Sequence, residues 1–286
     1  MTEIRNIGII GSGTMGTGIA QVCAQSGYSI TVFDSSIPAL EKSEILFLKN
    51  IEKAFEKKSI SESEFNFCRK SVSFSSDFSS LSDCDLVIEA IVENLEIKQN
   101  LFSDLSKMVS PETILASNTS SLSITAISGK TQNPDRVIGI HFFNPAYIMK
   151  LVEIIRGVHT SNETVERSRK FIDSIKKTTV VAKDTPGFIV NRIARPFYGE
   201  AFKIIGDNVT DVETTDKIME EIGGFKMGPF RLLDMIGIDV NFEVTKSVYN
   251  AFFQDPKYRP HIIQQRMVEA GRHGIKSKKG FYSYEN

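Results

Sequence analysis

Short apolar runs rich in β-branched residues alternate with longer amphipathic patterns from the start of the chain to residue 181. The short runs have the length of buried strands, and the longer patterns have the period of helices. Strands and helices that alternate in this way form a mostly parallel sheet with helices on both faces, so we predict an α/β domain. Its strands are expected at residues 6–10, 29–33, 71–74, 86–89, 114–116, 137–140, 151–155 and 179–181.

The pattern changes after the turn sequence Asp184-Thr-Pro-Gly. Helical periodicity then dominates and predicts an all-α second domain. We place the boundary there, which gives domains at residues 1–184 and 185–286, with a helical hairpin inserted near residues 38–70. The first helix of the second domain has a very broad apolar stripe, so we expect it to be buried on several faces, under the first domain or against a second copy of the chain.

Composition and charge narrow the function classes. The chain has 286 residues, 41% of them hydrophobic, which is enough for two domains with a core. Its net charge of −1 provides no overall basic field for nucleic acid. No membrane-spanning apolar run and no secretory leader are recognisable, so we expect a soluble cytoplasmic protein. Cys23, Cys68 and Cys84 form no Cys-x-x-Cys pair, which suits a reducing compartment.

A glycine-rich turn follows the first predicted strand. Gly11, Gly13 and Gly16 have Gly-x-Gly-x-x-Gly spacing, and the helix that follows offers its amino terminus to a pyrophosphate. The second predicted strand ends at Asp34, where a carboxylate can bind the ribose hydroxyls. The charge of Asp34 disfavours a further phosphate, so we predict NAD rather than NADP. The predicted cofactor-binding residues here are Gly11, Gly13, Thr14, Met15, Gly16 and Asp34.

Four polar side chains downstream of this turn suit the oxidation of an alcohol. Ser120 and His141 each follow a predicted strand, at the edge where parallel sheets bind ligands. An imidazole can take a proton near neutral pH, and the carboxylate of Glu153 can fix the tautomer of the His141 ring. Asn191, at the start of the second domain, can donate a hydrogen bond to an oxygen that develops charge, as can the Ser120 hydroxyl.

Several long strings in the sequence carry a family resemblance. They are SNTSSLSIT, IGIHFFNPAYIMKLVEII, DTPGFIVNR, MGPFRLLDMIGID and the terminal GFYSY. Together they resemble the 3-hydroxyacyl-CoA dehydrogenase family, most of all its short 3-hydroxybutyryl-CoA dehydrogenases, over essentially the whole chain. The resemblance implies a Rossmann-type domain, a helical carboxyl-terminal domain that forms a homodimer and contributes to the substrate site, and NAD as cofactor. It also implies reversible oxidation of an L-3-hydroxyacyl-CoA to the 3-ketoacyl-CoA, in fatty acid metabolism.

The same resemblance implies roles for individual residues. His141 matches the family's proton acceptor, and Glu153 matches its partner. Asn144 matches a position that contacts the nicotinamide carboxamide. The matched active-site positions are Ser120, His141, Glu153 and Asn191. The matched cofactor-contacting positions outside the glycine turn are Glu93, Lys98, Ser120, Asn144 and Lys276.

A stripe of lysines lies on one face of the first helix of the predicted hairpin. Lys49, Lys53 and Lys57 recur every four residues, and Glu52 and Glu56 lie among them. Such a stripe is typical of a solvated helix face, but its ammonium groups can also pair with phosphates. The resemblance implies that lysines of this hairpin bind coenzyme A. The predicted coenzyme A contacts are Lys53, Lys57 and Ser120.

Two other functions fit the sequence. A dehydrogenase of a free hydroxy acid or sugar acid shares the glycine turn and the histidine; the lysine stripe and a requirement for the CoA thioester distinguish it. A non-catalytic NAD-binding sensor needs none of the four polar residues, so their presence disfavours it. No metal site is predicted, because His159, His261 and His273 lie apart and lack the spacing of metal ligands.

Overall fold

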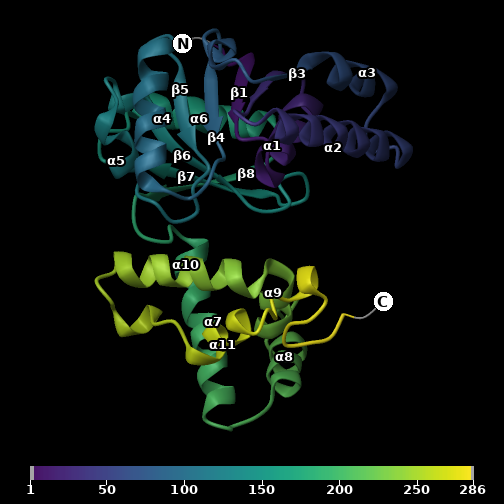
Figure 1. The fold of residues 1–286 in the computed structure, drawn as a ribbon, viewed down its shortest axis with the longest axis vertical. Helices are drawn as coiled ribbons and strands as arrows, with labels where there is room; N and C mark the ends of the chain where they lie inside the picture. The colour runs from purple at the N-terminus through teal and green to yellow at the C-terminus, as the bar shows by residue number, and fades with distance from the viewer. Residues whose placement is uncertain (1–2, 285–286) are drawn as a thin grey trace. The chain divides into compact units, whose positions relative to one another are not determined.

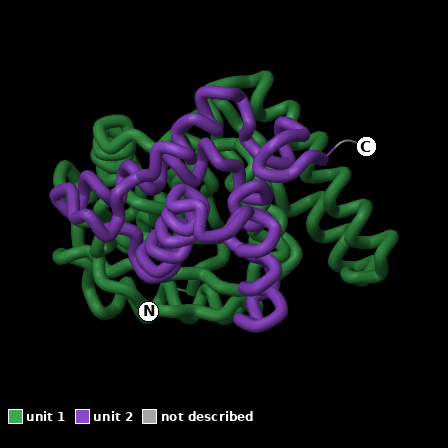
Figure 2. The backbone as a smooth tube through the Cα atoms, turned by 90° about the horizontal axis from the view of Figure 1, so that it is seen from below, with its two compact units in different colours: residues 1–185 green, residues 186–286 purple. Residues whose placement is uncertain are grey.

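Two compact units make up the molecule. The computed structural model describes residues 3–284. Unit 1 ends at Thr185 and unit 2 begins at Pro186 (Figure 2). The division falls within the turn sequence at which the hydrophobic pattern changes, and each unit has a hydrophobic core of its own.

An eight-stranded sheet with the order β3-β2-β1-β4-β5-β6-β7-β8 forms the centre of unit 1 (Figure 1). Neighbouring strands are parallel except β6 and β7, which are antiparallel. The first six positions repeat the order of the doubly wound dinucleotide-binding fold. The predicted α/β class and the eight predicted strands are confirmed, with small differences at strand ends. The strands are β1 Asn6–Ile10, β2 Ser29–Phe33, β3 Val72–Ser75, β4 Leu86–Glu89, β5 Ile114–Ser117, β6 Val137–Phe142, β7 Leu151–Arg156 and β8 Thr178–Lys183.

Both faces of this sheet are covered. Successive side chains of a strand point to opposite sides, so each strand packs against both layers. Ile7 and Ile9 of β1 belong to the core that also contains residues of helices α1 and α6. Gly8 faces the other side, where a Cβ on it would lie 2.7 Å from the Leu81 side chain. Helices α4 and α5 pack against each other, and both contact strands of the sheet. The helices are α1 Thr14–Gln25, α4 Leu95–Met108, α5 Ile124–Ile127 and α6 Asn162–Ser174.

A helical hairpin, α2 Ile37–Glu56 and α3 Glu62–Ser71, connects β2 to β3. Ser61 and Glu64 form a capping box that starts α3 directly after the turn. The stacked rings of Phe55 and Phe65, with centroids 4.8 Å apart, join the two helices. The hairpin contacts α1 and β3 and extends beyond the β3 edge of the sheet (Figure 1).

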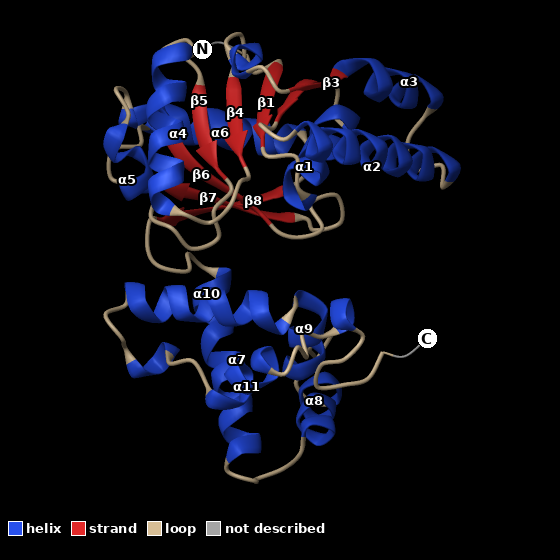
Figure 3. Cartoon of the chain, in the orientation of Figure 1, coloured by secondary structure: helices blue, strands red, loops and turns tan. Residues whose placement is uncertain are grey.

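Unit 2 consists of helices and loops (Figure 3). Its core joins Tyr198 and Phe202 of α7 to Phe230 of α9. Ile193 of α7 is 70% exposed within the single chain. Within the described residues, no helix is both long and apolar enough to cross a membrane. The helices are α7 Val190–Gly206, α8 Val212–Glu221, α9 Pro229–Ile236, α10 Ile238–Ala251 and α11 Ile262–Glu269, and short 3-10 helices lie at Phe78–Leu81, Ser128–Lys130, Pro134–Arg136, Pro256–Tyr258 and Ile275–Ser277.

Candidate active site

The glycine loop, residues 11–16, joins β1 to α1 with a backbone geometry that side chains would block. Gly11 has a φ of +100°, and a Cβ on it would lie 2.6 Å from the carbonyl oxygen of Ala90. A Cβ on Gly16 would lie 1.8 Å from the carbonyl oxygen of Gly11. Around Gly13, by contrast, a Cβ would meet no heavy atom of the described residues within 4 Å. This combination of tight turn, close packing and open approach fits a dinucleotide pyrophosphate at the start of α1.

Asp34 follows β2 and turns its carboxylate to the glycine loop. Its Oδ2 accepts hydrogen bonds from the N–H and the hydroxyl of Ser12, both at 2.8 Å, and its Oδ1 accepts one from the N–H of Ser36 at 3.0 Å. Partial burial raises the pKa of Asp34, but the three hydrogen bonds together lower it by more. The pKa of Asp34 therefore lies below its ordinary value. A charged carboxylate therefore lies where the fold receives the ribose hydroxyls.

His141 and Glu153 form a buried pair across β6 and β7. They face each other in the antiparallel register, and His141 Nδ1 lies 2.8 Å from Glu153 Oε2. Glu153 is fully buried and His141 is 5% exposed. A carboxylate accepts hydrogen bonds and donates none, so it favours the tautomer with the proton on Nδ1. Nε2 is then the ring nitrogen that can accept a proton.

Ser120 lies in the loop after β5, residues 118–122, which we call the Ser120 loop. Strands β1, β4, β5 and β6 are mutually parallel, so their carboxyl ends lie at one edge of the sheet. The glycine loop, Ser120 and the His141–Glu153 pair therefore share that edge. The Oδ1 of Asn118 accepts a hydrogen bond from the N–H of Phe142 at 2.8 Å, which ties the Ser120 loop to the strand that carries His141.

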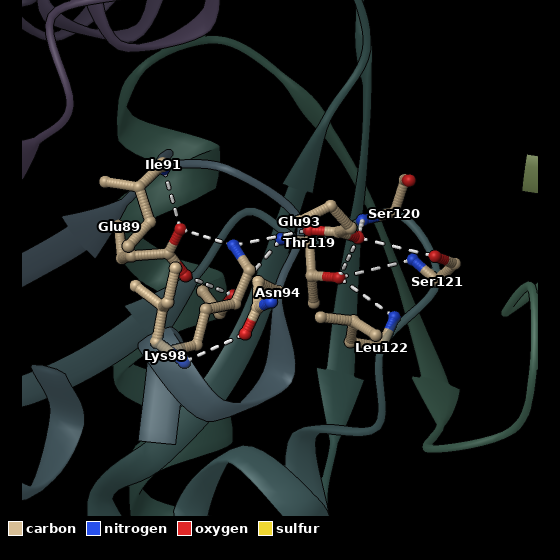
Figure 4. Close-up of polar contacts among 11 residues, drawn as sticks. Glu89, Ile91, Glu93, Asn94, Lys98, Thr119, Ser120, Ser121 and Leu122 are labelled. Atoms are coloured by element: carbon tan, nitrogen blue, oxygen red, sulfur yellow. Dashed lines mark hydrogen bonds and ion pairs between the residues drawn. The ribbon is translucent and has the colours of Figure 1, made fainter. Parts of the chain in front are cut away.

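Glu93 supports the Ser120 loop from the side of β4 (Figure 4). Its Oε1 accepts hydrogen bonds from the N–H of Ser120 at 3.2 Å, from the Ser121 hydroxyl at 3.3 Å and from the Thr119 hydroxyl. Its Oε2 lies 3.3 Å from the ammonium nitrogen of Lys98, a side chain that is only 1% exposed. The two residues expected to contact the cofactor at this position are thus in contact with each other.

Asn191 lies in the first turn of α7, in unit 2. Its Oδ1 accepts a hydrogen bond from Nη2 of Arg195 at 3.2 Å. Arg195 also donates to the carbonyl oxygen of Asn241 at 3.0 Å and to the Thr245 hydroxyl at 2.8 Å. Burial lowers the pKa of Arg195 to about 10, against a smaller opposing effect of Tyr198. The buried guanidinium therefore holds the oxygen end of the Asn191 amide.

The remaining predicted contact residues lie in three other places. Asn144 is exposed in the loop after β6. Lys53 and Lys57 are exposed at the carboxyl end of α2. Lys276 is in unit 2, where its ammonium nitrogen lies 2.6 Å from Oδ2 of Asp239. The structure thus brings Ser120, His141 and Glu153 to one edge of unit 1 and places Asn191 and Lys276 in unit 2.

Two family profiles account for nearly the whole chain. The 3-hydroxyacyl-CoA dehydrogenase NAD-binding domain matches residues 6–185, and the 3-hydroxyacyl-CoA dehydrogenase C-terminal domain matches residues 187–284. The chain belongs to the 3-hydroxyacyl-CoA dehydrogenase family. The resemblance that the sequence motifs indicated is confirmed, as are the Rossmann-type fold and NAD as the cofactor.

Individual relatives of this dehydrogenase chain are similar over almost all of its length. The 3-hydroxybutyryl-CoA dehydrogenase of Bradyrhizobium diazoefficiens is 38% identical, over 98% of this chain and 96% of its own. The 3-hydroxyadipyl-CoA dehydrogenase of Escherichia coli is 42% identical over 99% of this chain, which spans only 60% of that relative's length. The crystal structure of (S)-3-hydroxybutyryl-CoA dehydrogenase from Ralstonia eutropha has 37% identity and a TM-score of 0.94, and the match covers 99% of this chain and 100% of the other.

Two buried charged residues of this dehydrogenase that contact predicted site residues were not singled out in the sequence. Glu89 ends the apolar strand Leu-Val-Ile-Glu, and Arg195 lies one helical turn after Asn191. Glu89 is fully buried and Arg195 is 5% exposed. Charged side chains are almost never fully buried without a partner, so an acid at the end of an apolar strand is a usable signal. The partner of Glu89 is Lys98, nine residues later in the sequence.

Proposed function

We propose that this chain catalyses the reversible NAD-linked oxidation of an L-3-hydroxyacyl-CoA, with 3-hydroxybutyryl-CoA as the expected substrate, to the 3-ketoacyl-CoA. The buried His141–Glu153 pair carries the proposal. It lies at the edge of the sheet where the glycine loop offers a dinucleotide site. The names of the Bradyrhizobium and Ralstonia relatives support the choice of a four-carbon acyl-CoA.

His141 is proposed as the general base. Its Nε2 accepts the proton of the 3-hydroxyl group in oxidation and returns it in reduction. Glu153 keeps the other ring nitrogen protonated and stabilises the imidazolium that forms, because its carboxylate lies 2.8 Å from Nδ1. NAD, when bound, supplies the acceptor for the hydride that leaves C3.

Ser120 and Asn191 are proposed to hold the reacting oxygen and the thioester carbonyl. Their value is positional as well as electrostatic, since both present a donor where negative charge develops. Glu93 fixes the backbone of Ser120 at 3.2 Å. Arg195 donates a hydrogen bond to the oxygen of the Asn191 amide, and the NH2 group is the donor that we propose for substrate.

The direct test is oxidation of NADH by the purified chain with acetoacetyl-CoA, acetoacetate and longer 3-ketoacyl-CoAs. We expect turnover with the thioester and little with the free acid. Equal turnover of acetoacetate would favour the dehydrogenase of free hydroxy acids. NADH binding without turnover of any ketone would favour the sensor. A preference for longer chains would replace 3-hydroxybutyryl-CoA by a longer substrate of fatty acid metabolism.

We further propose that the second domain predicted at residues 185–286, which corresponds to unit 2, is the dimerisation and substrate domain, and that the chain forms a homodimer through its helices. Large apolar side chains exposed within the single chain support this: Ile193 is 70% and Ile222 83% exposed. Light scattering after size-exclusion chromatography should give twice the chain mass, and a monomer would refute the dimer. A cytoplasmic location is proposed from three buried free thiols, and cell fractionation tests it.

A further inference from the structure

Glu89 is a carboxylate with no access to solvent at the carboxyl end of β4. Its Oε1 lies 2.5 Å from the ammonium nitrogen of Lys98 and accepts a hydrogen bond from the N–H of Ile91 at 2.8 Å. Its Oε2 accepts a hydrogen bond from the Ser117 hydroxyl at 2.7 Å. Both oxygens therefore have donors, and both side chains of the ion pair are buried, at 0% and 1% exposure.

Stability gives little reason to keep such a pair. Removing two charges from water costs several kcal/mol per ion, and replacement of a buried ion pair by apolar side chains is often neutral or stabilising. Glu89 of β4 and Lys98 of α4 form such a pair, since both side chains are buried. The contacts of the pair indicate a role other than stability.

Lys98 connects the buried acid to the site. Its ammonium nitrogen lies 2.5 Å from Glu89 and 3.3 Å from Glu93. Figure 4 shows Glu93 between Lys98 on one side and Ser120 and Ser121 on the other. The contacts thus run from the end of β4 through α4 to the loop after β5, all within unit 1.

We propose that Glu89 is a positioning residue of the cofactor site. It fixes the Lys98 ammonium, which holds Glu93, which in turn receives the donors of the Ser120 loop. Without the Glu89 charge, Lys98 and Glu93 would pair in another geometry. These two predicted cofactor contacts would then shift, and Ser120 would shift with Glu93. This inference rests on the proposed roles of Glu93, Lys98 and Ser120.

The decisive variant is Glu89→Gln, which keeps the size of the side chain and removes its charge. We expect the Kd of NADH, measured by titration calorimetry, to rise about tenfold, because a charge-assisted contact to Lys98 is lost. The KM for NADH should rise with it, while the KM for acetoacetyl-CoA changes less. A Kd for NADH within about twofold of the parent overturns the proposal.

Asp216 provides a matched control in unit 2. It is also fully buried, it accepts hydrogen bonds from the N–H groups of Phe230 and Arg231 and from the Tyr282 hydroxyl, and its Oδ2 lies 3.9 Å from Nε of Arg231. Asp216→Asn should lower the melting temperature and leave the Kd of NADH unchanged. If both variants weaken NADH equally, the effect of Glu89→Gln is one of general stability, and the proposal is wrong.

A double-variant cycle tests the route through Lys98. In a Lys98→Met background, Glu89→Gln should change the Kd of NADH no further, because the group it positions is gone. Additive effects would overturn the proposal. This comparison also serves if Glu89→Gln alone fails to fold, since the double variant removes both charges together. NADH binding requires no acyl-CoA, so absence of acetoacetyl-CoA turnover with the expected Kd pattern would reject the proposed function alone.

Discussion

The two ends of the unit 1 sheet both bury charged side chains but give them different partners. At the carboxyl end, acids pair with ionisable side chains: Glu153 with His141 at 2.8 Å and Glu89 with Lys98 at 2.5 Å. At the amino end, the buried cation Arg136 donates to backbone carbonyl oxygens. One end therefore contains pairs of ionisable side chains, and the other contains contacts between a cation and the backbone.

The amino-end contacts join the segments before β5 and β6 to each other and to helices α4 and α6. Arg136 precedes β6, and its guanidinium reaches the carbonyl oxygens of Ser106 at 2.9 Å and Thr113 at 3.4 Å. Arg167 of α6 donates to the carbonyl oxygen of Glu112 at 2.9 Å. Carbonyl oxygens do not titrate, and cations that satisfy them stabilise the fold without taking part in chemistry. We therefore expect substitutions at the carboxyl end to change kinetics and substitutions at the amino end to change stability.

The largest expected effect is that of His141→Ala at the carboxyl end. Loss of the general base should lower kcat for acetoacetyl-CoA reduction about 10²–10⁴-fold. The KM for NADH should change little, because the glycine loop and Asp34 remain. Steady-state assays at saturating NADH measure the effect.

The exposed His159 supplies the control for this prediction. His159→Ala should keep kcat within about twofold of the parent, as expected for a surface substitution. The Kd of NADH for His141→Ala shows whether the variant is folded. If a folded His141→Ala variant keeps kcat within about tenfold of the parent, the imidazole is not the general base. The expectation that substitutions at the carboxyl end change kinetics is then wrong.

The next largest effect is expected for Arg136→Met at the amino end, this time on stability. Carbonyl oxygens in the loop before β5 would lose their donor, at a cost of about 2–4 kcal/mol in the free energy of unfolding. Urea unfolding measures this loss. The folded Arg136→Met variant should have the same kcat and the same KM for NADH as the parent.

Arg169→Met is the matched control for Arg136→Met, because the Arg169 side chain is 54% exposed and pairs with Asp173 only at 4.0 Å. It should change the free energy of unfolding by about 0.5 kcal/mol or less. A large change in kcat for Arg136→Met at unchanged stability would break the division between the two ends of the sheet.

The fold was predictable because the central strands are buried on both faces. Such strands appear as continuous apolar runs, as at residues 86–89 and 137–140, and turns separate them from the helices. The pairing of His141 with Glu153 was predictable from spacing, since a short excursion returns the chain beside β6. That β7 runs antiparallel there, which puts the two side chains opposite each other, follows from the structure.

The Glu89–Lys98 pair was only partly predictable from sequence: the end of an apolar strand marks Glu89 as a buried acid, but no local pattern marks Lys98 as its partner. Lys98 occupies a helix whose pattern is otherwise amphipathic, and a lysine in such a helix is usually solvated. Its burial depends on how α4 packs against the end of β4, a tertiary contact that local periodicity does not encode. The same holds for Arg195, whose partners Asn241 and Thr245 lie on another helix of unit 2.

Asp34→Asn should have a smaller effect, on cofactor choice. The loss of charge should raise the KM for NADH about tenfold, since hydrogen bonds to charged groups are stronger than those to neutral groups. It should also reduce the preference for NADH over NADPH. Because the pKa of Asp34 is lowered in the folded chain, its contribution to stability is present above its ordinary pKa and is lost as the pH falls through the folded value. The same lowered pKa keeps the Asp34 carboxylate charged at mildly acidic pH, so the preference for NADH should persist there.

Asp211→Asn is the control for the cofactor prediction. Asp211 caps α8 in unit 2 by accepting a hydrogen bond from the N–H of Thr214 at 2.7 Å, and its pKa is also lowered, chiefly by that donor. Its replacement should leave the ratio of kcat/KM for NADH and NADPH unchanged. Equal ratios for Asp34→Asn and the parent would show that the ribose position does not select the cofactor.

The smallest effect is expected from the exposed lysines of the hairpin, which lie at neither end of the sheet. Replacement of Lys53 and Lys57 together by Glu should raise the KM for acetoacetyl-CoA about three- to tenfold, because exposed ion pairs contribute little each. The KM for NADH should stay unchanged. Lys107→Glu with Lys170→Glu makes the same change in net charge elsewhere on unit 1. If this pair raises the KM for acetoacetyl-CoA equally, the effect is one of overall charge, and coenzyme A does not bind at the hairpin.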